Sequence, residues 1–178
     1  ILVCLVGSEM CIRDRQGALG IVMNKIIPIS ENIIFKSLKI TADVERKNLL
    51  NGGPVDMNKL FVIHNQSDHK ESLIVQDGLC LTSNIDVIES IGNGTFGGSY
   101  RLALGYCGWD AGQLEHEASK NSWLILDTPS DVIFNKKPEE LVRSISGKVG
   151  YDIDKIQNSE IITNCLLYTS DAADDTCC

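Results

Sequence analysis

The hydrophobic residues of the sequence fall in short runs, and none approaches the ~20 consecutive residues needed for a membrane-spanning helix. Internal repeats and low-complexity linkers are also missing, which argues against a repeat protein. The chain has no P-loop, no Ser-His-Asp arrangement and no spacing typical of paired metal ligands. These absences favour a soluble cytoplasmic domain, and the sequence identifies no catalytic residue, no cofactor and no metal site.

The cysteines lack an informative spacing. Five of the seven lie near the two ends of the chain, and only Cys80 and Cys107 lie between them. Two lone cysteines without a C-x-x-C motif indicate neither a disulfide framework nor a zinc site. Each is therefore expected to be a free, buried thiol, and a reactive Cys107 is the less favoured alternative.

Basic residues are few relative to acidic ones. The formal charge of the chain is −8 at pH 7. No predicted helix carries a basic stripe, and no helix-turn-helix pattern is visible. Because non-specific affinity for DNA comes from Lys and Arg side chains that neutralise phosphates, direct nucleic-acid binding is disfavoured.

The two ends of the chain resemble translated sequencing adaptor. Residues 10–15 and 165–170 can be encoded by the two strands of a single DNA sequence of the transposase-adaptor type. We therefore expect adaptor-like residues 1–15, a domain over residues 16–164, and adaptor-like residues 165–178. Without the five acidic and two basic residues of these ends, the formal charge of −8 becomes −5. The middle segment has the length of a single domain.

Apolar runs and turn signals predict a mixture of short strands and helices. Strands are expected over residues 17–24, 60–64, 72–76, 79–82, 102–106, 123–126 and 132–134, and helices over residues 30–39, 83–91 and from 138 to about 147. Asp77-Gly78 is a strong hairpin turn, and Ser83 is expected to cap the second helix. The irregular order of elements favours a single compact α+β domain, or a mixed sheet with helices on one side, over a doubly wound sheet.

Residues 92–97 spell G-x-G-x-x-G, the pattern of dinucleotide-binding loops. In those proteins the pattern follows a strand and opens a helix. Here it follows a predicted helix and precedes a predicted strand, so we expect a flexible loop without a nucleotide.

The most informative stretch is residues 101–123. Its apolar strand ends at Tyr106, and a glycine-rich corner follows around Gly108. Asp110 suits a helix N-cap, and Gln113 is placed to reach back to the Asp110 amide, as in a capping box. For these residues, capping is favoured over catalysis.

The helix expected after this corner carries two acidic residues and ends near a tryptophan. Glu115 and Glu117 lie about 200° apart around a regular helix, so they cannot both face one ion. A solvated face is the favoured interpretation of these two residues. For Trp109 and Trp123, packing is favoured over a ligand platform.

This stretch closely resembles the signature of the YqgE/AlgH family of small bacterial proteins. In that family Leu-Gly-Tyr is followed by Gly/Ser-Trp, Gly-Gln-Leu-Glu-x-Glu and a Trp, which residues 104–117 and Trp123 match. Residues 17–25 and 52–55 match two earlier motifs of the family. The resemblance implies a compact α+β fold with a mixed, strongly curved sheet, and an N-terminal segment with a strand ahead of residue 17. Members are often labelled transcriptional regulators, and no biochemical activity is implied.

Three functional hypotheses are open. The favoured one is a non-enzymatic binding or regulatory protein that acts through an unknown protein partner. The second is an unrecognised enzyme or small-molecule binder that uses residues 106–117, and the least favoured is a DNA-binding regulator. The sequence does not indicate the oligomeric state.

The candidate binding residues share a position at strand ends, glycine turns and the opening of a helix, where ligands often collect. They are Asn24, Gly52, Gly53, Pro54, Tyr106, Gly108, Trp109, Gln113, Glu115 and Glu117. We expect Asn24, the turn at residues 52–54 and the corner at residues 106–113 to converge on one surface.

Overall fold

The computed structural model describes residues 2–5, 17–42, 47–68, 71–120, 123, 128–149 and 166–168, and for residues 2–5, 146–149 and 166–168 only the backbone is described. The strands are β1 (Leu2–Leu5), β2 (Ala18–Val22), β3 (Ile26–Ser30), β4 (Asn48–Asn51), β5 (Val55–His64), β6 (Leu73–Gln76), β7 (Leu79–Thr82), β8 (Tyr100–Trp109) and β9 (Leu166–Tyr168). The helices are α1 (Glu31–Ser37), α2 (Ile85–Gly92), α3 (Gln113–Ser119), α4 (Ser130–Asn135) and α5 (Pro138–Val149).

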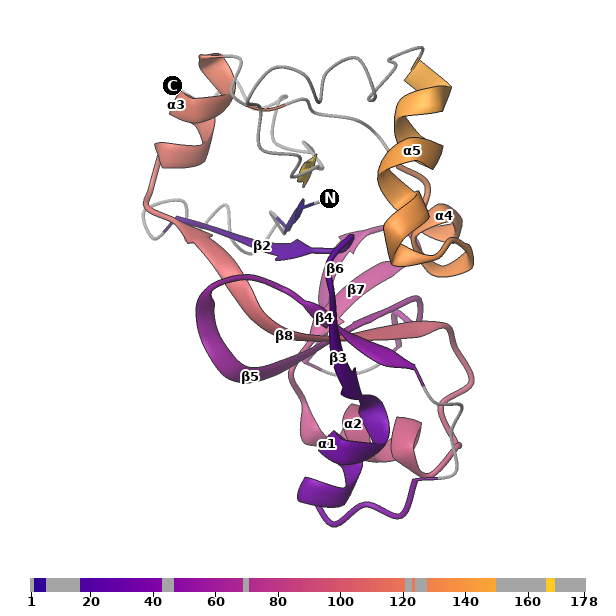
Figure 1. Cartoon of the computed structure of the whole chain (residues 1–178). Coiled ribbons are helices and arrows are strands. Elements are labelled where there is room, and N and C mark those ends of the chain that lie inside the picture. Colours follow the sequence, from indigo (N-terminus) through magenta and orange to yellow (C-terminus); the bar gives the residue numbers. More distant parts are fainter. Residues whose placement is uncertain are drawn as a thin grey trace.

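These strands form a mixed, open sheet (Figure 1). Its hydrogen-bonded order is β6-β7-β5-β8-β2-β1-β9, and β4 joins β3 to β8. The pairs β4–β8 and β1–β9 are parallel, and the other pairs are antiparallel. The predicted single α+β domain with a mixed sheet is therefore confirmed.

Helices cover both faces of this sheet, and the expectation that they lie on one side is wrong. On β5, Phe61 and Ile63 share a core cluster with residues of α4 and α5. Val62 points to the opposite face and shares a second cluster with residues of α1 and α2. Figure 1 shows these two helix pairs on opposite sides of the central strands. A strand that is buried on both faces reads as a continuous apolar run, which is why β5 carries no alternating pattern that would reveal the second layer.

Several predicted elements are confirmed. The β6–β7 hairpin turns at Asp77-Gly78, and Gly78 has the positive φ of +68° that such a turn requires. Ser30 caps α1 by accepting a hydrogen bond from the Asn32 amide. The residues that follow Gly92 up to β8 form a loop, so the G-x-G-x-x-G pattern does not open a helix.

Two local predictions are wrong. The apolar residues 132–134 lie in α4, because so short an apolar run fits a helix as well as a strand. The cap of α2 is Asn84, whose Oδ1 accepts from the Asp86 amide at 2.7 Å, and Ser83 is one residue too early. Of the predicted strand at residues 123–126, only Trp123 lies within the described part of the chain.

The sequence interpretation did not include β3 and β4, and it ended β8 too early. The β8 strand continues through Gly105 to Trp109, so Tyr106 does not lie at a strand end. Gly105 has a φ of +73°, and the β5–β8 register shifts between Val55 and Leu60. Gly105 therefore lies in a continuous β8 strand, opposite a bulge of β5.

The two ends of the chain contribute backbone pairing at one edge of the sheet. β1 pairs antiparallel with β2, from Leu2 opposite Val22 to Leu5 opposite Leu19. β9 pairs parallel with β1. From their resemblance to adaptor sequence, we expect both ends to be dispensable to the domain, and this stays a prediction.

Candidate functional site

The turn at residues 52–54 bridges β2 and β8. The Gly52 carbonyl accepts from the Val22 amide at 2.8 Å, and the Gly52 amide donates to the Leu104 carbonyl at 2.8 Å. One residue earlier, the Asn51 amide donates to the Lys25 carbonyl at 2.9 Å. The chain segments on either side of Asn24 are therefore tied to this turn through backbone hydrogen bonds.

Glycines allow the turn to contact β8 directly. Gly53 has a φ of +153°, and a Cβ there would overlap the carbonyl group of Tyr106. A Cβ on Gly105, at φ +73°, would overlap the Gly53 carbonyl oxygen. Both positions combine a backbone conformation that favours glycine with a contact that excludes a side chain.

A bulge of β5 extends over this contact. Val55 pairs with Tyr106 and Leu60 pairs with Leu104, so the residues between Val55 and Leu60 are extra relative to β8. Asp56 within the bulge has a φ of +46°. Figure 1 shows β5 curving away from β8 in this region.

The bulge exposes apolar side chains. Met57 is 57% exposed and Val55 is 36% exposed, and the Met57 backbone lies beside Gly105. Tyr106, by contrast, packs edge-to-face on Phe61 with ring centroids 5.8 Å apart. We call the exposed surface formed by Pro54, Val55 and Met57, which lies over Gly105, the bulge face.

A hydrogen-bond network fixes α3 to the segment that precedes it. The Asp110 amide donates to Gln113 Oε1 at 3.0 Å, which confirms the predicted reach of Gln113. Gln113 Nε2 donates to Glu117 Oε1 at 3.0 Å, and Trp123 Nε1 donates to Glu117 Oε2 at 2.9 Å. The helix itself begins two residues later than predicted: Gly112, at φ +75°, is the N-cap, and the Asp110 carbonyl accepts from the Gln113 amide in the preceding turn.

Packing supports this network. Trp109 and Trp123 meet edge-to-face with centroids 6.0 Å apart, and both pack against the cluster of Leu114 and Val22. Hydrogen bonds from Gln113, and next from Trp123, lower the pKa of Glu117 below its usual value, with a further contribution from Trp109. Glu117 is thus held as a carboxylate acceptor, which does not suit it to act as a proton donor near neutral pH.

The Cys107 thiol is not activated. Burial raises its pKa, and Lys25 opposes this effect. Cys107 is a free cysteine, as is the buried Cys80. Because the thiolate is the nucleophilic form, these surroundings support the expectation of an unreactive thiol.

The sequence-predicted residues therefore separate into two groups. The buried Gly52 and Gly53 lie against Gly105 and Tyr106 beneath the bulge face, Pro54 belongs to that face, and the chain around Asn24 is bonded to the same turn. Trp109, Gln113 and Glu117 belong to the α3 network, Gly108 is exposed in the strand that leads to it, and Glu115 points to solvent. Val55 and Met57 were missed, because a bulge cannot be inferred from an isolated strand whose partner is unknown.

Two kinds of feature are not found in the described ranges. No three His, Cys, Asp or Glu side chains are placed to hold a metal ion there. Within the same residues, no helix is long and apolar enough to cross a bilayer.

The fold and the candidate site define a small α+β protein whose mixed sheet is covered by helices on both faces. A glycine turn is hydrogen-bonded to the central strand β8, opposite a bulge of β5. The chain belongs to the AlgH-like family, whose sequence profile matches residues 9–154.

Individual relatives agree with this assignment. The chain is 39% identical over 137 residues to a UPF0301 protein of Ralstonia pickettii, covering 74% of this chain and 71% of the relative. It is 34% identical over 151 residues to a UPF0301 protein of Cupriavidus metallidurans, covering 83% and 80%.

Solved structures show the same architecture. The solution structure of the AlgH protein from Pseudomonas aeruginosa matches with a TM-score of 0.65 and 29% identity, over 80% of this chain and 78% of that one. The crystal structure of DIP2367 from Corynebacterium diphtheriae matches with a TM-score of 0.60, over 82% and 75% of the two chains. At 13% identity it supports the fold alone.

Proposed function

We propose that this chain is a non-enzymatic binding protein that acts through a protein partner, and that the partner docks an apolar segment on the bulge face. The observation that carries the proposal is the exposure of Met57 and Val55 on a bulge packed over Gly105. A flexible thioether is suited to adaptable protein contacts, and an exposed apolar side chain on an ordered strand offers area that a partner can bury. The proposal retains the cytoplasmic location expected from the sequence.

The alternatives gain less support. The polar side chains of the α3 network bond to one another, so Gln113 and Glu117 have a structural explanation that needs no ligand. The acidic charge of the chain opposes direct binding to DNA. If the chain regulates transcription, as family members are labelled to do, it would therefore act through a bound protein and not by contacting DNA.

A matched pair of variants tests the docking surface. The chain is used to capture a protein from a lysate of Ralstonia pickettii, and the captured protein is identified, purified and titrated by calorimetry. We expect Met57→Asp to weaken the measured affinity by at least about tenfold, since a buried charge opposite an apolar segment is costly. Ile74→Asp, on β6 at 55% exposure, is the control and should bind as the wild type does.

Two results would refute the proposal. One is equal affinity of the wild type and Met57→Asp for the purified partner, which would show that the partner binds outside the bulge face. The other is equal weakening by both variants, which would show that the exposed charge acts without regard to position.

A further inference from the structure

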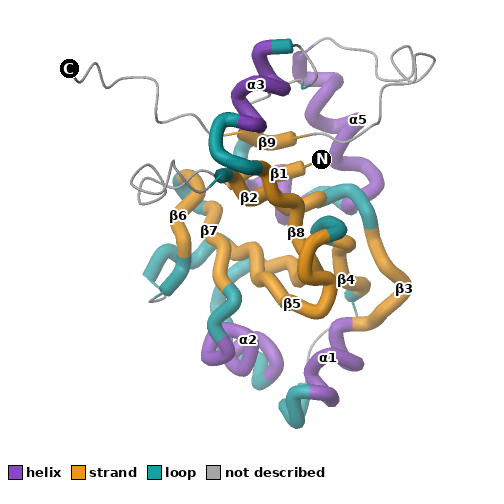
Figure 2. The backbone as a smooth tube through the Cα atoms, turned by 90° about the vertical axis from the view of Figure 1, so that its left-hand side faces the viewer, coloured by secondary structure: helices purple, strands orange, loops and turns teal. Residues whose placement is uncertain are grey.

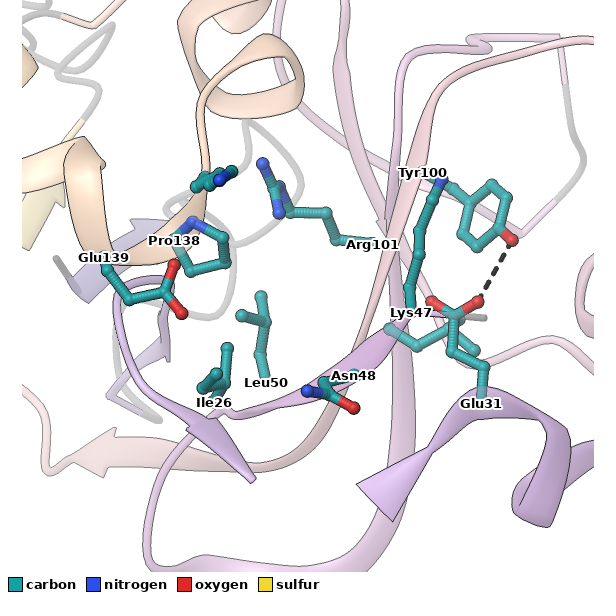
Figure 3. A pocket seen from close by; sticks show the side chains of 11 residues that line it. Ile26, Glu31, Lys47, Asn48, Leu50, Tyr100, Arg101, Pro138 and Glu139 are labelled. Carbon is teal, nitrogen blue, oxygen red and sulfur yellow. Dashed lines mark hydrogen bonds between the residues drawn. The ribbon is translucent and has the colours of Figure 1, made fainter. Parts of the chain in front are cut away.

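A pocket of about 260 Å³ lies where the parallel strands β4 and β8 begin. Figure 3 shows it between Glu31 at the start of α1, Tyr100 and Arg101 at the start of β8, and Glu139 at the start of α5. No residue of the bulge face lines it. It lies below the ~300–1,000 Å³ of pockets that take drug-sized ligands, so a small molecule fits it.

Charges of both signs surround this pocket. Lys47, Arg101 and Lys137 supply the positive charges, and Glu31 and Glu139 supply the negative ones. The Glu31 side chain is only 1% exposed, and its Oε2 accepts from the Tyr100 hydroxyl at 3.2 Å (Figure 3). The Lys47 ammonium lies 4.8 Å from the centre of the Tyr100 ring.

Hydrogen bonds to backbone carbonyls of and next to α4 fix the Arg101 side chain at the wall of the pocket. Its Nε donates to the Ile133 carbonyl at 2.7 Å, and its Nη2 donates to the carbonyls of Phe134 and Lys136, which end α4. Within the described residues, the hydrogen bonds of this side chain use Nε and Nη2 and not Nη1. Burial lowers the pKa of Arg101, while Glu139 and Glu31 raise it, so both carboxylates act on the guanidinium.

Between these charged groups the lining is apolar. Ile26, Leu50, Leu102 and Pro138 contribute to the wall, and Figure 3 shows Ile26 and Leu50 below Arg101 and Glu139. A ligand in this pocket therefore contacts positively charged, negatively charged and apolar side chains.

We infer that this pocket binds a small zwitterion of the free amino-acid class, with its carboxylate toward Arg101 and Lys137, its ammonium toward Glu139, and an apolar side chain on Ile26 and Leu50. An anion meets Glu139, and a cation meets Arg101 and Lys137, as a like charge in a partly dry site, which is unfavourable. A zwitterion pairs with side chains of both signs. An ordered guanidinium is also suited to a planar carboxylate.

The first experiment titrates the isotope-labelled chain with each of the twenty standard L-amino acids by NMR. At least one with an apolar side chain is expected to saturate with a Kd below about 1 mM, with the largest shifts at the Asn48, Leu50 and Glu139 amides. The best binder is then compared with its deaminated acid and its decarboxylated amine, each expected to bind about tenfold or more weakly. Absence of saturable shifts with all twenty amino acids, or equal binding of the acid or the amine, would overturn the inference.

Two matched pairs of surface variants locate the binding. Glu139→Gln should weaken amino-acid binding about tenfold and change binding of the deaminated acid little, whereas Glu140→Gln, in the same helical turn but outside the pocket, should change neither. Lys137→Met should weaken both, and Lys136→Met neither. Equal effects of Glu139→Gln and Glu140→Gln would indicate a long-range charge effect and refute the site. These titrations involve no protein partner, so their outcome is independent of the proposed function.

Discussion

At the scale of single residues, the glycines have the clearest roles. Gly53 and Gly105 lie in backbone conformations that favour glycine, and each has a neighbouring backbone group in the space of its missing side chain. The sequence indicated the turn at residues 52–54, but it could not show which strand the turn contacts. That contact, together with the bulge beside it, is what exposes Val55 and Met57.

Gly53→Ala tests this close contact. We expect it to lower the free energy of unfolding by at least about 2 kcal/mol, because the strained φ and the overlap with the Tyr106 carbonyl add. Denaturant unfolding followed by tryptophan fluorescence measures the change. Gly97→Ala is the control, since a Cβ there meets nothing within 4 Å. It should stay within about 0.5 kcal/mol of the wild type, and a similar loss in both variants would contradict the role assigned to Gly53.

Glu117 gives a pH-dependent prediction. Its folded-state pKa lies below the usual 4.5, because the carboxylate accepts hydrogen bonds from Gln113 and Trp123. It therefore stabilises the fold above that pH, and this contribution is lost as the pH falls through the lowered value. Glu117→Gln should be less stable than the wild type at pH 7, and the difference should shrink as the pH falls below about 4.5.

Thermal unfolding of both proteins between pH 7 and pH 3 measures this difference. Glu115→Gln, on the exposed side of the same helix, is the control and should differ little from the wild type across the range. A stability difference for Glu117→Gln that stays constant with pH would show that the network does not depend on the charge.

At the scale of elements, the sequence predicted those that carry their own local signal. The β6–β7 hairpin has Asp77-Gly78, and α1 has apolar residues Ile33, Ile34 and Leu38 at helical spacing. The elements that were missed or misassigned depend on tertiary partners. β3 contains Pro28, which obscures a strand pattern, and residues 132–134 are too few to distinguish strand from helix.

The N-cap of α2 can be tested directly, because the sequence predicts Ser83 and the structure shows Asn84. Asn84→Ala removes the hydrogen bond that Asn84 Oδ1 accepts from the Asp86 amide and the exposed one that Nδ2 donates to Glu71 Oε2, and it should cost about 1 kcal/mol of stability, mainly through the lost cap. Ser83→Ala, at the cap position expected from the sequence, should cost less than about 0.5 kcal/mol. Chemical denaturation of the two variants compares them, and the reverse order of stability would restore Ser83 as the cap.

At the scale of the whole molecule, the three motifs that carry the family resemblance come together through one sheet. The turn at residues 52–54 meets β2 and β8 because β8 is central and accepts β2, β4 and β5 as neighbours. Gly53 and Tyr106 do lie together, but strand-end reasoning does not account for their contact, because Tyr106 lies within β8 and does not end it. The charged pocket could not be anticipated, because its residues come from three segments far apart in the sequence, within residues 26–50, 100–102 and 137–139. Figure 2 shows α1 and α5 on either side of the sheet.

β1 covers the outer edge of β2 and pairs on its other side with β9. The AlgH-like profile matches residues 9–154, so β1 and β9 lie outside the segment that the profile matches. Removing residues 1–8 should change the melting temperature by only a few degrees, since β2 keeps its pairing with β8 from Ala18 opposite Trp109 to Gly20 opposite Cys107. The same deletion exposes the outer edge of β2, and an open strand edge invites pairing with another chain.

We therefore expect light scattering to show concentration-dependent association of this deletion variant at an almost unchanged melting temperature. A deletion of residues 169–178, which removes no described strand, is the control and should stay as monodisperse as the full chain. A large fall in melting temperature on removing residues 1–8 would mean that β1 is integral to the domain, and would reject the expectation that the N-terminal end is dispensable. Equal monodispersity of all three proteins would show instead that the β2 edge is protected without β1.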